Sequence, residues 1–293
     1  MNNSYSSIAT FKQCPYKYKL IYLDEHYIDD SSLVLEFGTL VHATEENIGN
    51  QLKDNNKVDY VQVEKDFISG VENLRDSYLD AFYIPDKVGR TYDGKYRYYL
   101  NNSLHRLEKR IRNENLEIVG LEKEFYLTYK EYTFHGFIDR LLKKGDTYII
   151  EDIKTYSQPM LGKDLKTPLQ CVIYSLAVKQ MFGENIKIEC HYDLPLCDVV
   201  QNVDPDFLDQ GIKELDNLLA KMEKSDFEPN PTALCHWCVF SETYPVEIKE
   251  ARGLCPYYCI WVPDDRRTRP NIPWQGKEKH QQILENFQKN LKK

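Results

Sequence analysis

Residues 147–154 read Thr147-Tyr148-Ile149-Ile150-Glu151-Asp152-Ile153-Lys154, a short apolar run with three charges near its end. A run of this length and composition predicts a buried β-strand. Because side chains alternate along a strand, Asp152 and Lys154 share one face and Glu151 lies on the other. Burying a carboxylate and an ammonium is costly unless the two pair or bind a metal. This strand is therefore the predicted centre of both the fold and a candidate site.

Two more strands precede it, near 116–128 and 132–142, and the turn Lys144-Gly145-Asp146 joins the second to 147–154. The second strand carries Gly136-Phe137-Ile138-Asp139, so a hairpin of this length brings Asp139 towards Asp152. Two carboxylates at that separation suit one Mg²⁺ or Mn²⁺ ion, which prefers hard oxygen ligands. A structural ion pair between Asp152 and Lys154 is the alternative that these residues alone leave open.

The rest of the chain is predicted to be mostly helical. Helical periodicity covers Leu33–Leu52, Tyr60–Phe82 and about 96–112, and further helices are expected at Pro168–Phe182 and after Asp204-Pro205, with a strand at Ile186–Tyr192 between them. The predicted fold class is α/β, with a mixed central sheet flanked by helices. We expect one integrated domain made of a helical N-terminal part (1–115), a core (116–227) and a cysteine-rich tail with a closing helix (228–293).

Composition narrows the class of protein. The net charge of −8 argues against a protein that coats nucleic acid over its whole surface, but it allows a local basic track. No apolar run reaches 18 residues and no secretory signal begins the chain, so a cytoplasmic protein without a membrane segment is expected. Two basic stretches could bind phosphate, and the first of them could instead be a solvated helix face: His105, Arg106, Lys109, Arg110 and Arg112, then Arg266, Arg267 and Arg269.

Five short motifs occur in a recognisable order. They are Gly38-x-x-x-His42 with Glu45 and Glu46, Gly136-x-x-Asp139, Asp152-Ile153-Lys154-Thr155, and Gln170-x-x-x-Tyr174, preceded by Phe11-Lys12-Gln13-Cys14-Pro15. Over about residues 4–260 this set resembles the RecB-type branch of the PD-(D/E)xK nucleases, which includes CRISPR-adaptation nucleases and the nuclease domains of recombination helicases. The resemblance implies a restriction-endonuclease-like core and hydrolysis of DNA.

The resemblance also implies roles for individual residues. Metal ligands would be His42, Asp139, Asp152 and the backbone carbonyl of Ile153. Lys154 would orient or deprotonate the attacking water and stabilise developing charge. Gln170 and Tyr174, one helical turn apart, would position Lys154 or contact DNA. Glu45 and Glu46 would support the histidine or the metal, or simply lie on a solvated helix face.

The eight cysteines suggest a second, structural metal. In the iron–sulfur members of this branch, one N-terminal and three C-terminal cysteines hold a 4Fe–4S cluster. Cys14, Cys235 and Cys238 match, but Tyr244-Pro245 stands where the third C-terminal ligand is expected, and Cys255-Pro256 would replace it after an insertion. A zinc site of Cys235, Cys238, Cys255 and Cys259 is the alternative. Cys171, Cys190 and Cys197 are expected to be structural.

The expected function is metal-dependent DNA cleavage, as an exonuclease acting on ends or single strands in DNA recombination or repair, in a bacterial or phage-infected cell. The chain has no P-loop, so any helicase or recombination partner would be a separate protein. A catalytically silent DNA-binding or scaffold subunit is the alternative. A silent copy would be free to lose one of His42, Asp139, Asp152 and Lys154, whereas all four are present.

Overall fold

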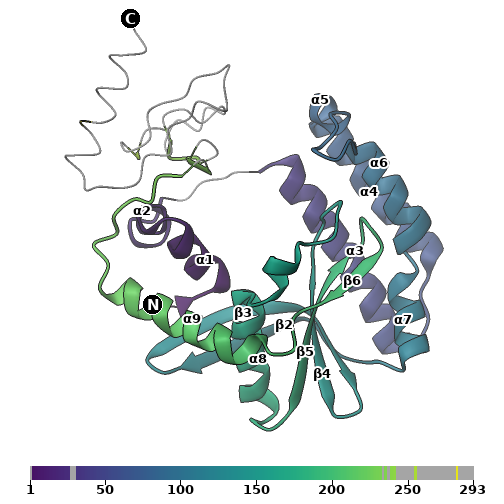
Figure 1. Ribbon diagram of the computed structural model, residues 1–293. Coiled ribbons are helices and arrows are strands. Elements are labelled where there is room, and N and C mark those ends of the chain that lie inside the picture. Colours follow the sequence, from purple (N-terminus) through teal and green to yellow (C-terminus); the bar gives the residue numbers. More distant parts are fainter. Residues whose placement is uncertain are drawn as a thin grey trace, which may run out of the picture. The chain divides into compact units, whose positions relative to one another are not determined.

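A computed structural model describes residues 2–26, 31–232, 234–235, 238–241, 254–255 and 282 (Figure 1). Their contacts form two compact units, Met1–Tyr5 with Ser31–Leu215 and Ser6–Asp30 with Asp216–Lys293. The basic residues Arg266, Arg267 and Arg269 and Cys259 lie outside the described residues, as does the predicted helix after Gln275 apart from residue 282. None of the described helices is long and apolar enough to cross a membrane.

The first unit contains a mixed sheet, as predicted. Strands β2, β3 and β4 form an antiparallel meander, β4 and β5 are parallel, and β5 and β6 are antiparallel. The short β1 lies parallel to β3. The bounds are β1 (Asn2–Asn3), β2 (Glu117–Tyr129), β3 (Tyr132–Lys144), β4 (Thr147–Ile153), β5 (Lys187–Leu194) and β6 (Val199–Asn202).

The helices of this unit begin where capping residues satisfy their first backbone N–H groups. The Ser32 hydroxyl accepts a hydrogen bond from the Leu35 nitrogen at the start of α3, and the Asp59 carboxylate accepts one from the Gln62 nitrogen at the start of α4. The bounds are α3 (Leu33–Asn55), α4 (Tyr60–Ser77), α5 (Leu79–Phe82), α6 (Tyr92–Tyr98), a π-helical turn η2 (Tyr99–Ser103), α7 (Arg106–Glu114), a 3₁₀ turn η3 (Gly162–Leu165), α8 (Leu169–Phe182) and α9 (Phe207–Glu223).

Two layers of helices cover the two faces of the sheet. The apolar stripes of α3 and α4 pack together and against Leu142 and Ile149 of the strands. On β5, Cys190 and Tyr192 contact α8 on the opposite face. Helix α8 is buried on most of its circumference, and Gly211 of α9 lies so close to it that an added Cβ would be 2.2 Å from Val172 Cγ2. The sheet is therefore central.

The second unit contains most of α1 (Tyr5–Gln13), then α2 (Pro15–Tyr18) and a π-helical turn η1 (Lys19–Leu23). Its apolar contacts are largely aromatic. The ring of Tyr18 stacks on Phe227 at a centroid distance of 6.0 Å, and Phe11 meets both rings edge-on. Leu20 packs with Val239 and Phe240, so two segments more than 200 residues apart in the sequence meet within this unit.

Candidate active site

Three metal-ligating side chains converge where α3 passes the β2–β3 hairpin. One ligand atom each of His42, Glu122 and Asp139 lies within 4.8 Å of the other two. Nδ1 of His42 is 3.6 Å from Oδ2 of Asp139, and both side chains remain partly open to solvent. One imidazole nitrogen and two carboxylates form a donor set that can hold a divalent cation.

Glu122 is a member of this group that the sequence motifs did not indicate. It sits in β2 with φ of 41°, a left-handed backbone conformation that is uncommon for a residue with a side chain and that costs about 1–3 kcal/mol. Such strain concentrates at functional sites. Leu121 pairs with Arg140 and Lys123 with Ile138, so Glu122 stands level with Asp139. Burial and then the charge of Asp139 raise the pKa of Glu122.

A second group consists of Asp152 and three side chains around it. Its Oδ1 accepts a hydrogen bond of 2.6 Å from Nε2 of Gln170, and its Oδ2 lies 2.5 Å from Nζ of Lys154. The same Gln170 nitrogen donates a hydrogen bond to the Tyr174 hydroxyl over 3.0 Å. Oε1 of Gln170 accepts a hydrogen bond from Nζ of Lys154 over 3.3 Å. The structure thus brings together the four residues that the sequence groups here; their catalytic roles stay predictions.

The two groups are joined through Asp139, because its Oδ2 accepts a hydrogen bond of 2.7 Å from the backbone nitrogen of Ile153. Burial raises the pKa of Asp152 to about 6, opposed by the charge of Lys154 and reinforced by that of Asp139. Burial would lower the pKa of Lys154, but the adjacent Asp152 carboxylate outweighs it and the pKa is raised. Lys154 is therefore held as an ammonium. The predicted role of the Ile153 carbonyl as a metal ligand stays a prediction.

A buried ionic network lies against the other face of the same strands. The fully buried Arg140 guanidinium donates to Glu45, Glu151 and Asp193 over 2.8–3.0 Å. Two arginines of α7 add further ion pairs: Arg110 pairs with Glu151, and Arg106 pairs with Asp193. Arg140 follows Asp139 directly and Glu151 precedes Asp152. The network therefore fixes the backbone that presents both carboxylates.

This network corrects two expectations from the sequence. Glu45 pairs with Arg140 and accepts from the Tyr99 hydroxyl at 2.9 Å, so it anchors α3 one helical turn from His42 and does not face the solvent. Arg106 and Arg110 are committed to buried carboxylates and are not available to DNA phosphates. Glu46 is half-exposed, and its charge acts on the pKa of Glu122.

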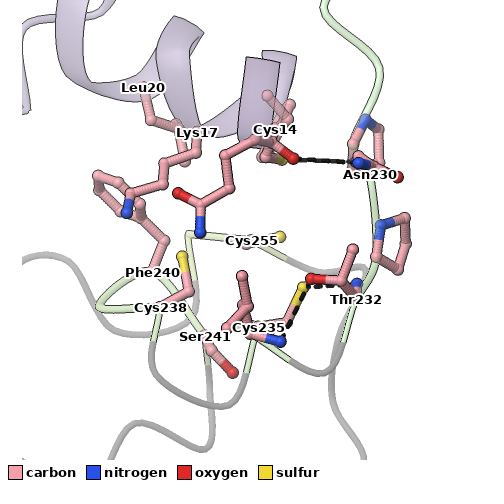
Figure 2. A pocket seen from close by; sticks show the side chains of 15 residues that line it. Cys14, Lys17, Leu20, Asn230, Thr232, Cys235, Cys238, Phe240, Ser241 and Cys255 are labelled. Carbon is pink, nitrogen blue, oxygen red and sulfur yellow. Dashed lines mark hydrogen bonds between the residues drawn. The ribbon is translucent and has the colours of Figure 1, made fainter. Parts of the chain in front are cut away.

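The second unit holds a cavity of about 120 Å³ lined by four cysteines (Figure 2). Cys14 precedes α2; the others are Cys235, Cys238 and Cys255. Backbone nitrogens of Asn230 and Thr232 lie 3.4 Å and 3.2 Å from the sulfur atoms of Cys14 and Cys235 and donate to them. A cysteine sulfur can accept such hydrogen bonds both as a thiol and as a metal-bound thiolate. Cys259 and Tyr244 lie outside the described residues.

The chain is similar to one protein family and to several solved structures. The sequence profile of the PD-(D/E)XK nuclease superfamily matches residues 2–243. A crystal structure from Eubacterium rectale, of a protein named only provisionally as an exonuclease, has a TM-score of 0.47 and 13% identity, covering 81% of this chain and 86% of that one. The crystal structure of SSO0001 has a TM-score of 0.30 and 17% identity, covering 80% and 95%.

At these values neither structural likeness bears on function. The search of curated proteins gave no match. The superfamily profile spans more than half of the chain and includes every residue of the two active-site groups. The chain therefore belongs to the PD-(D/E)XK nuclease superfamily.

Proposed function

We propose that this protein is a divalent-metal-dependent deoxyribonuclease, and specifically an exonuclease that acts on free DNA ends. The observation that carries the proposal is the pairing of the His42–Glu122–Asp139 group with a buried carboxylate–lysine pair, joined through Asp139. A purely structural ion pair at Asp152 and Lys154 would not need a strained glutamate and a histidine beside it.

The side chains suit a hard cation such as Mg²⁺ or Mn²⁺. Oδ2 of Asp152 is buried and, apart from Lys154, has no partner among the described residues, so it can accept a further interaction. Together with His42, Glu122 and Asp139 it would hold the cation. A bound cation neutralises the scissile phosphate and lowers the pKa of a coordinated water.

Lys154 would act as a cation in this site. Because the Asp152 carboxylate keeps it protonated, it is suited to orient the attacking water and to stabilise the charge that develops on the phosphate. Gln170 would fix the positions of the Asp152 and Lys154 side chains relative to each other through its two hydrogen bonds. Tyr174 would fix the orientation of that amide.

Cleavage of matched linear and circular DNA in Mn²⁺ tests the proposal. We expect the wild type to shorten linear DNA from its ends and to leave circular DNA intact, and Asp139→Ala and Lys154→Ala to lose at least about a hundredfold of the activity. Equal cleavage by both variants would refute the active-site assignment. Cleavage of the circles at the rate of the linear strand would refute the exonuclease mode alone.

For the cysteine cavity we propose a 4Fe–4S cluster held by Cys14, Cys235, Cys238 and Cys255. The four thiols line one cavity, and Cys14, which belongs to the cluster set but not to the zinc set, is among them. The place of Cys14 in this cavity supports a cluster over a zinc ion held by Cys235, Cys238, Cys255 and Cys259, and such a centre would be structural.

Two substitutions separate the metals. Elemental analysis of anaerobically purified protein should find iron and sulfide, and these should be lost in Cys14→Ser and retained in Cys259→Ser. Zinc retained in Cys14→Ser and lost in Cys259→Ser would establish the alternative site.

We place the enzyme in the cytoplasm of a bacterial or phage-infected cell, serving recombination or repair beside separate helicase or recombination proteins.

A further inference from the structure

The hairpin formed by β2 and β3, whose backbone is drawn in Figure 1, carries a cluster of three aromatic side chains that we call the aromatic face: Tyr126, His135 and Phe137. Tyr126 is 62% exposed and Phe137 45%. The rings of Tyr126 and His135 stack at 4.5 Å with an interplanar angle of 15°, and Phe137 meets His135 edge-on at 5.4 Å. Single exposed apolar side chains are ordinary, but exposed aromatic side chains gathered in one cluster are a candidate interaction surface.

The aromatic face leads directly to the candidate metal group. Tyr126 pairs with His135 and Glu124 with Phe137, so these side chains share one side of the hairpin. The same alternation along β3 reaches Asp139 two residues after Phe137. With a strand rise of about 3.4 Å per residue, Phe137 and His135 stand about 7 Å and about 14 Å from Asp139 along the strand. Those steps are comparable with successive nucleotides of an extended single strand.

The rings are held in place by their edges. The Tyr126 hydroxyl donates to Glu124 over 3.0 Å, and a ring nitrogen of His135 lies 2.9 Å from the same carboxylate oxygen. Glu124 thus contacts both the Tyr126 hydroxyl and one ring nitrogen of His135, and the faces of the rings remain available to a partner. A cross-strand aromatic pair that only stabilises the sheet would explain Tyr126 with His135, but it would not explain the open Phe137 beside the site.

We infer that the aromatic face is a base-stacking surface that receives the unpaired bases of a single DNA strand next to the phosphate being cut. The inference rests on the proposed nuclease function and adds the form of the substrate to it. Stacking on an aromatic ring needs an unpaired base and is tolerant of sequence. Bases inside a duplex are already stacked on both sides, so duplex DNA would gain nothing from this surface.

Direct binding in EDTA, which prevents metal-dependent cleavage, tests the inference. Fluorescence anisotropy would compare an oligothymidylate with an abasic strand of equal length and charge. We expect the wild type to bind the oligothymidylate at least about tenfold more tightly, because stacking is lost in the abasic strand. The double variant Tyr126→Ala/Phe137→Ala should bind both strands as weakly as the wild type binds the abasic one.

A matched control lies on the same hairpin. Thr128 and Thr133 are exposed and directly opposite each other, so Thr128→Ala/Thr133→Ala changes the hairpin without removing a ring and should keep the full preference. Tyr126→Phe with Phe137→Tyr should also keep it. Oligothymidylate binding by the double alanine variant equal to that of the wild type, or no wild-type preference over the abasic strand, would overturn the inference. Absence of cleavage in Mn²⁺ would instead refute the proposed function.

Discussion

Lowering the pH should weaken binding of a divalent cation through one buried carboxylate. Burial raises the pKa of Asp152 to about 6, against the opposing charge of Lys154. A protonated carboxyl group is a poor ligand, so proton and cation compete for the same oxygen atoms. Above pH 6 the carboxylate is mostly ionised and available; below pH 6 it is mostly neutral.

The size of the effect follows from the position of this pKa. A group with pKa about 6 is roughly 90% ionised at pH 7 and roughly 10% at pH 5, so apparent affinity for Mn²⁺ should fall about tenfold between these values. An aspartate with an ordinary pKa of about 3.9 would stay more than about 90% ionised at pH 5. Isothermal titration of metal-free protein with Mn²⁺ at several pH values measures the difference.

Two variants isolate the contribution of Asp152. Because a protonated imidazole cannot bind a metal either, the titrations are repeated with His42→Gln. This variant should bind Mn²⁺ more weakly, but its affinity should still fall between pH 7 and pH 5 because Asp152 is present. Asp152→Asn should bind weakly at every pH and lose that decrease. Affinity in His42→Gln that is unchanged from pH 7 to pH 5 would refute the reasoning, because the carboxylate would then lack the raised pKa or would not bind the metal.

Three further substitutions test other parts of the account. Arg140→Met should lower the free energy of unfolding by about 3–5 kcal/mol in denaturant titrations, because it leaves buried carboxylates unpaired. The control Arg112→Met removes an exposed ion pair within a helix and should change that free energy by less than about 1 kcal/mol. Equal effects of the two substitutions would contradict the buried network. Glu122→Gly should bind Mn²⁺ about tenfold or more less tightly in calorimetry without loss of stability, since glycine adopts φ of 41° without strain; tight binding would exclude Glu122 as a ligand. Gly211→Ala should destabilise the fold by about 1–3 kcal/mol, and Val172→Ala in the same chain should recover part of that loss; a neutral Gly211→Ala would contradict the packing of α9 on α8.

Much of the architecture could be predicted because it depends on local patterns. The run ending in Asp152 and the turn at Gly145 predict β4 and its partner β3, and both strands are present. Gln170 and Tyr174 are one turn apart on a predicted helix, so their common face follows from helical geometry. The short strands β1 and β6 were not predicted, because two or four residues carry no periodicity to detect.

Glu122 is a residue of the candidate site that the sequence pattern did not predict. Its left-handed backbone interrupts the alternation that predicts strand faces. The hairpin register was still a usable signal, since Tyr129 pairs with Tyr132 across the turn and counting back along both strands brings Glu122 level with Asp139. The buried network had no such signal. Arg106 and Asp193 are separated by 87 residues, and their pairing is set by tertiary packing alone.

Anomalous diffraction from crystals soaked in Mn²⁺ tests the central claim most directly, because it locates the metal without relying on activity. We expect a manganese peak bonded to His42, Glu122, Asp139 and Asp152, and we expect this peak to be lost in Asp139→Ala. Manganese bound elsewhere on the chain, with these four side chains unligated, would contradict the proposed metal site.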